Sequence, residues 1–111
     1  MKNIYSNIQK INNKSLSKAI KYLKINRLVG VPTETVYGLA GNAYSKSSIN
    51  KVFKLKKRPK INPLIVHYYN CEDSKKDVVL NKNFFKLYNK LCPGPITFIL
   101  KKKAKSKISI H

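Results

Sequence analysis

The chain has 111 residues, which is enough for one domain with a single modest hydrophobic core. Its apolar stretches are far shorter than the roughly 20 residues that a membrane-spanning helix requires. The first residues also lack the apolar run of a secretory signal peptide. These features argue against a membrane protein, and we expect a cytoplasmic one.

The charge balance is strongly basic, with 24 Lys and Arg residues against 4 Asp and Glu residues and a formal net charge of +20. Only Arg27 and Arg58 are arginines. Lys, Asn, Ile and Tyr are abundant and share AT-rich codons, so codon bias is one explanation of the charge. An affinity for polyanions is the other, although nucleic-acid surfaces usually recruit arginine for its planar fork.

Cysteine and histidine are too sparse for a metal site. Cys71 and Cys92 stand alone, without a second Cys or His at metal-ligand spacing. In a cytoplasmic chain we expect both thiols to be reduced and structural. The sequence therefore predicts no protein-bound metal ion.

Three helices are indicated by apolar residues at helical spacing. In residues 15–25, Leu16, Ala19, Ile20 and Leu23 fall on one face, and Ser15 is the expected N-cap. The same spacing predicts helices over residues 45–57 and 83–91. Prolines follow both of these helices, and the residue before a proline avoids helical geometry.

Short β-prone runs separate these helices. We expect strands over residues 27–31, 63–68 and 96–101, and an ordered loop over residues 32–41. Helices and strands then alternate along the chain without internal repeats. This order predicts an α/β domain in which at least some strands pair in parallel.

The segment 32–39 gathers polar side chains directly after the first expected strand. Thr33, Glu34, Thr35 and Tyr37 lie at the position where α/β proteins commonly bind ligands. Glu34 is also one of only four acidic residues. A binding loop and a solvated turn both remain consistent with this composition.

A second polar segment follows the second expected helix. Lys56 and Arg58, separated by one residue, are able to clasp a phosphate or a small oxyanion, and Arg58 is able to do so with two hydrogen bonds. The prolines at 59 and 63 stiffen the connection and lower the ordering cost of binding. Lys57 and Lys60 are interpreted as part of a solvated face.

His67, on the expected strand 63–68, is the third polar feature. A lone histidine on a strand is either a packed or surface residue or a ligand contact. The chain contains no Ser-His-Asp set, phosphate-binding glycine loop or metal motif. The residues alone predict a small α/β anion-binding protein.

Three blocks of sequence, residues 32–39, 55–67 and 93–100, together resemble the YrdC-like family of threonylcarbamoyl-AMP synthases. They read Pro-Thr-Glu-Thr-Val-Tyr-Gly-Leu, then Leu-Lys-x-Arg-Pro-x-x-Asn-Pro-Leu-Ile-Val-His, then Pro-Gly-Pro-Ile-Thr-Phe-Ile-Leu. The resemblance covers roughly residues 15–101. It implies a twisted mixed sheet with flanking helices around a basic, concave active site.

The resemblance also implies roles for five residues. Thr35 and His67 would contact threonine, Arg58 and Asn62 would contact ATP, and Lys56 would join Arg58 in binding phosphate or bicarbonate. The implied reaction joins L-threonine, bicarbonate and ATP into L-threonylcarbamoyladenylate and pyrophosphate, for the t6A modification of tRNA. Mg²⁺ would arrive with ATP, without an identified protein ligand, and no side chain is assigned a catalytic role.

The family domain continues beyond the third block, so we expect residues 1–111 to be the N-terminal portion of one truncated domain. Two alternatives remain. One is a non-catalytic RNA-binding module that uses the basic surface to bind tRNA or another RNA. The other is a domain that forms carbamoyl-AMP for hydrogenase maturation, which the absence of cysteine pairs disfavours.

Overall fold

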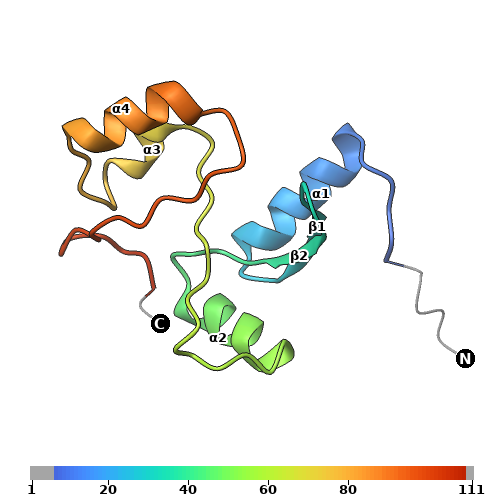
Figure 1. Ribbon diagram of the computed structural model, residues 1–111. Coiled ribbons are helices and arrows are strands. Elements are labelled where there is room, and N and C mark those ends of the chain that lie inside the picture. Colours follow the sequence, from blue (N-terminus) through green and yellow to red (C-terminus); the bar gives the residue numbers. More distant parts are fainter. Residues whose placement is uncertain (1–6, 110–111) are drawn as a thin grey trace, which may run out of the picture. The chain divides into compact units, whose positions relative to one another are not determined.

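The computed structural model describes residues 7–109 and divides after Pro59 into two compact units (Figure 1). The first unit contains a helix, a strand pair and a second helix. The second unit contains two further helices and long irregular segments. In chain order the elements are α1 (Asn13–Lys24), β1 (Val29–Pro32), β2 (Tyr37–Ala40), α2 (Lys46–Leu55), α3 (Cys71–Ser74) and α4 (Lys82–Leu91).

Helix α1 begins two residues earlier than expected because asparagine caps it. The backbone N–H of Ser15 donates to Asn12 Oδ1 at 2.9 Å, and the N–H of Asn12 donates to Ser15 Oγ at 3.0 Å. This reciprocal pair satisfies two backbone donors that the first turn of a helix leaves free. The expectation that Ser15 is the N-cap is wrong: Ser15 is the third helical residue.

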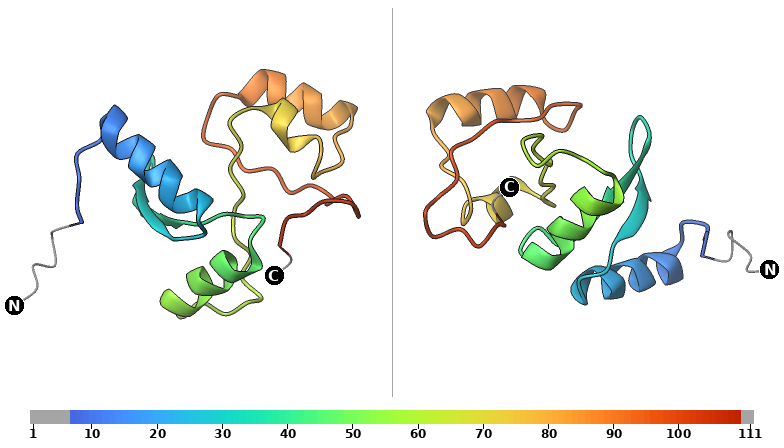
Figure 2. Two further views of the ribbon diagram at one scale, coloured as in Figure 1. Left: turned by 180° about the vertical axis from the view of Figure 1, so that it is seen from behind. Right: turned by 90° about the horizontal axis from the view of Figure 1, so that it is seen from below.

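Strands β1 and β2 form an antiparallel hairpin, paired from Val29–Ala40 to Pro32–Tyr37. Helix α1 packs against β1, and the two views of Figure 2 show helix and hairpin side by side. The expectation of a loop throughout residues 32–41 is therefore wrong, because the chain turns after β1 and pairs with it. Pro32 is the last residue of β1, where its missing N–H does little harm.

Helix α2 begins as predicted, with Ser45 as its N-cap and the N–H of Ser48 donating to Ser45 Oγ at 3.1 Å. Its buried face carries Val52 and Phe53, each 3% exposed. The fully buried Ser48 hydroxyl donates to the backbone oxygen of Asn26 at 2.9 Å. Apolar burial and this hydrogen bond together join α2 to the chain that leaves α1.

Two strands expected in the second unit are not formed. Residues 63–68 and 96–101 are irregular, and the β pairing among the described residues of this unit is an isolated antiparallel bridge between Val78 and Lys102. A β-prone run becomes a strand only when a partner satisfies its backbone groups. Both pairings within residues 7–109 are antiparallel, so the parallel pairing expected from the sequence is not found there.

The core of the second unit is built around α4. Its N-cap is Asn81, whose side chain accepts from the N–H of Phe84 at 2.9 Å. The buried Phe84 ring packs edge-on against Phe98, 4.9 Å between centroids, and stacks on Tyr88 at 5.6 Å. These aromatic contacts bring the segment after α4 back onto the helix.

A buried carboxylate ties the remaining segments of this unit together. Asp77, 2% exposed, accepts hydrogen bonds from the Tyr68 hydroxyl at 2.9 Å and the Ser106 hydroxyl at 2.6 Å. Its backbone oxygen accepts from the N–H of Lys103 at 2.7 Å. A buried charge is tolerated when it is hydrogen-bonded in this way. Asp77 therefore anchors both the end of the irregular 60–68 segment and the basic segment after residue 100.

In the part of the chain that the structure describes, no helix is both long enough and apolar enough to cross a membrane.

Candidate functional site

The connection between β1 and β2, which we call the 33–36 turn, is held by one side chain. Thr33 Oγ1 accepts hydrogen bonds from the N–H of Thr35 at 3.3 Å and of Val36 at 3.1 Å. The same hydroxyl donates to the backbone oxygen of Val36, which also accepts from the N–H of Thr33 at 3.2 Å. Thr33 therefore caps the turn, a use of threonine that is common in loops.

Thr35 is presented by this turn toward solvent. Its side chain is exposed, and within residues 7–109 its hydroxyl has no hydrogen-bond partner. A threonine hydroxyl offers one donor and two acceptor positions. Because Thr33 makes the bonds that hold the turn, the Thr35 hydroxyl is not used within residues 7–109.

The C-terminal end of α2 positions Arg58 through its backbone. The N–H of Arg58 donates to the oxygen of Phe53 at 3.0 Å, and the N–H of Lys57 donates to that of Lys54 at 3.2 Å. Lys57 lies in the left-handed region, with φ of 50°. This pattern is the Schellman motif, which reverses the chain and satisfies the last helical carbonyls. Lys56 and Arg58 lie at this helix end, and the side chains of both are exposed.

Asn62 and His67 lie in the irregular 60–68 segment of the second unit, and both are exposed. His67 was expected on a strand, and that expectation is wrong. It does not pack into the core, whereas its neighbour Tyr68 is half-buried and bonded to Asp77. The histidine is thus exposed immediately before an anchored residue.

The five predicted site residues divide between the two units. Thr35, Lys56 and Arg58 belong to the first unit, where they come from the 33–36 turn and the end of α2. Asn62 and His67 belong to the second unit. All five side chains are exposed, as groups that contact a ligand must be before it binds.

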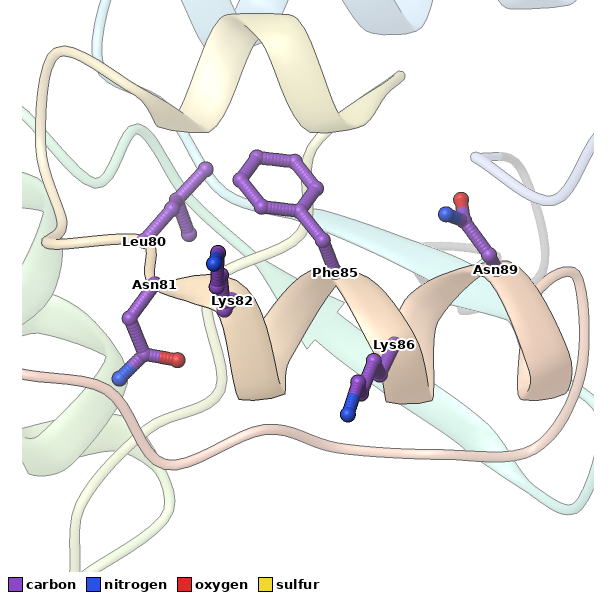
Figure 3. A pocket seen from close by; sticks show the side chains of 6 residues that line it. All are labelled: Leu80, Asn81, Lys82, Phe85, Lys86 and Asn89. Atoms are coloured by element: carbon purple, nitrogen blue, oxygen red, sulfur yellow. The ribbon is translucent and has the colours of Figure 1, made fainter.

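A cavity of about 550 Å³ lies in the second unit along α4 (Figure 3). It contains none of the predicted site residues. Its lining residues are Leu80, Asn81, Lys82, Phe85, Lys86 and Asn89.

The electrostatics of the described residues are dominated by lysines, which far outnumber the acidic residues. Of the four acidic residues, Asp77 is buried and Glu72 pairs with Lys75 at 2.8 Å. The hydrogen bond to the Glu72 carboxylate, and then its charge, raise the pKa of the exposed Lys75 above its ordinary value. Residues 7–109 contain no group of three His, Cys, Asp or Glu side chains able to hold a metal ion, and both cysteines are free.

The chain is similar to known threonylcarbamoyl-AMP synthases. It is 38% identical to that of Pyrococcus abyssi over 88 residues, which cover 76% of this chain and 25% of the relative. It is 32% identical to a putative threonylcarbamoyl-AMP synthase of Methanocaldococcus jannaschii over 107 residues, which cover 93% of this chain and 52% of the relative. It is 37% identical to that of Bacillus subtilis over 97 residues, covering 80% and 26%. The chain thus spans about a quarter to a half of the length of these relatives.

Two solved structures share the fold. A doubly substituted variant of P. abyssi Sua5 matches with a TM-score of 0.82 and 30% identity, over 91% of this chain and 31% of that one. P. abyssi Sua5 complexed with L-threonine matches with a TM-score of 0.79 and 32% identity, over 87% of this chain and 29% of that chain. These matches confirm the expected YrdC-like α/β fold. The family model Sua5_yciO_yrdC, described as telomere recombination, matches residues 21–110, and the chain therefore belongs to the Sua5_yciO_yrdC family.

Proposed function

We propose that this chain supplies the N-terminal part of the active site of a threonylcarbamoyl-AMP synthase. The reaction would convert L-threonine, bicarbonate and ATP into L-threonylcarbamoyladenylate and pyrophosphate, at the start of the t6A modification of tRNA. The observation that carries this proposal is the Thr35 hydroxyl, exposed and without a partner in residues 7–109 on a turn fixed by Thr33. The similarity to a Sua5 structure complexed with L-threonine supports it.

The amino acid and the nucleotide would use different residues. Thr35 and His67 would hydrogen-bond the polar groups of L-threonine. Arg58 and Asn62 would contact ATP, and Lys56 would join Arg58 on phosphate or bicarbonate oxygens. A guanidinium is suited to such oxygens because it donates two parallel hydrogen bonds.

The chemistry requires positioning and charge neutralisation more than a reactive side chain. The threonine amine attacks the carbon of bicarbonate, and loss of water leaves a carbamate. A carbamate oxygen then attacks the α-phosphorus of ATP, and pyrophosphate leaves. Bicarbonate and ATP are anionic and threonine carries a carboxylate, so cations and hydrogen-bond donors held in place contribute most of the acceleration. Mg²⁺ would enter as part of the nucleotide substrate, and we assign it no ligand from this chain.

The charge bears on partners beyond these substrates. The 24 basic and 4 acidic residues give a formal net charge of +20, which would suit tRNA or another RNA as a polyanionic partner. We place the reaction in the cytoplasm. A bare RNA-binding module is the rival function. Isothermal titration with L-threonine separates the two, because only a synthase site should bind the free amino acid.

The direct test is substrate dependence in the full-length enzyme. Pyrophosphate release should require L-threonine, bicarbonate and ATP together. Thr35→Val and His67→Ala should each raise the threonine requirement roughly 2- to 12-fold, the loss of one neutral hydrogen bond. ATP affinity and melting temperature should stay nearly unchanged. A lower melting temperature with equal weakening of every substrate would show instead that both residues are structural.

A further inference from the structure

We propose that Thr33 is a positioning residue of the threonine site, which acts by holding the turn that presents Thr35. This inference rests on the proposed function. It adds Thr33 to the proposed threonine site. Thr33 belongs to the family-like block 32–39 but is assigned no contact with a ligand. Thr33 acts through the backbone of its neighbours and need not touch L-threonine.

The hydrogen bonds of Thr33 converge on the residues that follow it. Its hydroxyl oxygen accepts from the N–H groups of Thr35 and Val36, at 3.3 and 3.1 Å, and donates to the Val36 oxygen. A hydroxyl that both accepts and donates uses its full capacity inside the turn. The direct contact with the Thr35 N–H links the Thr33 side chain to the conformation of Thr35.

Little else holds this turn in place. Val36 is 70% exposed and Tyr37 is 81% exposed, so neither side chain is packed against the unit. Glu34 and Thr35 are exposed as well. Without apolar burial, the Thr33 side chain and the pairing of the flanking strands are what keep the turn from opening.

The Thr33 methyl group is a second feature of this side chain. It lies close to Gly38 of β2, since a Cβ added to that glycine would meet it at 3.5 Å, an ordinary contact distance. A β-branched side chain has few χ1 rotamers, so seating the methyl group also aims the hydroxyl. Threonine thus suits the position better than serine, and the two groups can be tested separately.

The test separates hydroxyl from methyl by comparing Thr33→Val with Thr33→Ser. Valine keeps the methyl group and removes the hydrogen bonds. Serine keeps the hydroxyl and loses only the contact with Gly38. Ser17→Ala is the control, because Ser17 is an exposed hydroxyl residue of α1, outside the 33–36 turn and the three family-like blocks. Each variant is measured for L-threonine affinity, ATP affinity and the amide hydrogen exchange of residues 35 and 36.

We expect Thr33→Val to weaken L-threonine binding roughly 10-fold and to speed exchange at the amides of Thr35 and Val36 by a similar factor, with ATP affinity unchanged. Thr33→Ser should stay within about threefold of the parent in L-threonine affinity and in amide exchange, and Ser17→Ala should change neither. A Thr33→Val variant that binds L-threonine as well as the parent would overturn the positioning role. Failure of the parent itself to bind L-threonine would overturn the proposed function, and this role with it.

Discussion

Helices α1 and α2 of the first unit end in the same backbone pattern, but a different type of residue adopts the left-handed conformation at each end. After α1, Asn26 has φ of 64°, and the N–H of Arg27 donates to the Tyr22 oxygen at 3.0 Å. After α2, Lys57 has φ of 50°, and the N–H of Arg58 donates to the Phe53 oxygen at 3.0 Å. Each end is a Schellman motif in which one non-glycine residue adopts the left-handed conformation.

The surroundings of the two residues differ. Asparagine enters the left-handed region more readily than most residues, and Asn26 is also tied down: Asn42 Nδ2 donates to its side-chain oxygen at 3.1 Å. Lysine has no such preference, and the Lys57 side chain is exposed. The end of α1 is thus stabilised by Asn26 itself. At the end of α2, which is followed by Arg58, Lys57 keeps an unfavourable backbone conformation. Local strain of this kind is concentrated at functional sites.

Among substitutions at the two helix ends, we expect the largest effect from replacing Arg58, and the effect is on ATP binding. In the proposed site its guanidinium binds nucleotide phosphate, so Arg58→Ala should weaken ATP binding by roughly 10- to 150-fold, the loss of about 1.5–3 kcal/mol of charge-assisted hydrogen bonding. Isothermal titration with ATP measures the change. The rate of pyrophosphate release should fall with it when ATP is below saturation.

Lys57→Ala is the matched control for Arg58. It removes a neighbouring positive charge but keeps a Cβ in the left-handed conformation, so the helix end is unaltered. ATP affinity should change by less than about twofold, because an exposed charge that contacts no ligand contributes little. Equal losses in Lys57→Ala and Arg58→Ala would mean that the lysine-rich segment attracts ATP only through its total charge.

The contrast between the two helix ends also marks the limit of what was predictable from the sequence. Apolar spacing located α1, α2 and α4 because burial of one face decides where a helix forms. Their starts shifted by one or two residues where asparagines, Asn12 and Asn81, act as caps. The left-handed conformation of Lys57 has no sequence signal, since it is imposed by how the chain leaves the helix.

Strands were harder to predict because pairing partners are set by tertiary structure. Strand β2 is four residues long and contains Gly38, so its sequence lacks a strand pattern. The β-prone residues 63–68 and 96–101 do not form strands in the described chain. The motif singled out Thr35 and Arg58, and their roles as ligand contacts stay predictions. The role of Thr33 needed the hydrogen bonds of the turn, which no residue spacing reveals.

A medium effect is expected at Asn26, and it is an effect on stability. Asn26→Ala removes the acceptor for Asn42 and places an unsuited residue at positive φ, so the free energy of unfolding should fall by about 1–2 kcal/mol. Urea denaturation measures it. Asn26→Gly, which tolerates the backbone and loses only the side-chain bond, should cost less. If both variants lose the same amount, the left-handed conformation is not what asparagine stabilises here.

The smallest expected effect has the opposite sign and lies at Lys57. Glycine adopts positive φ without a Cβ clash, so Lys57→Gly should relieve local strain. It also gains freedom in the unfolded chain, so the net stabilisation should be only about 0.5 kcal/mol. Lys54→Gly is the matched control: it makes the same chemical change inside α2, where glycine should cost about 1 kcal/mol relative to alanine. Urea denaturation should therefore move the two variants in opposite directions. A destabilised Lys57→Gly would contradict the assignment of strain to this helix end, and would leave the two ends alike in energy as well as in geometry.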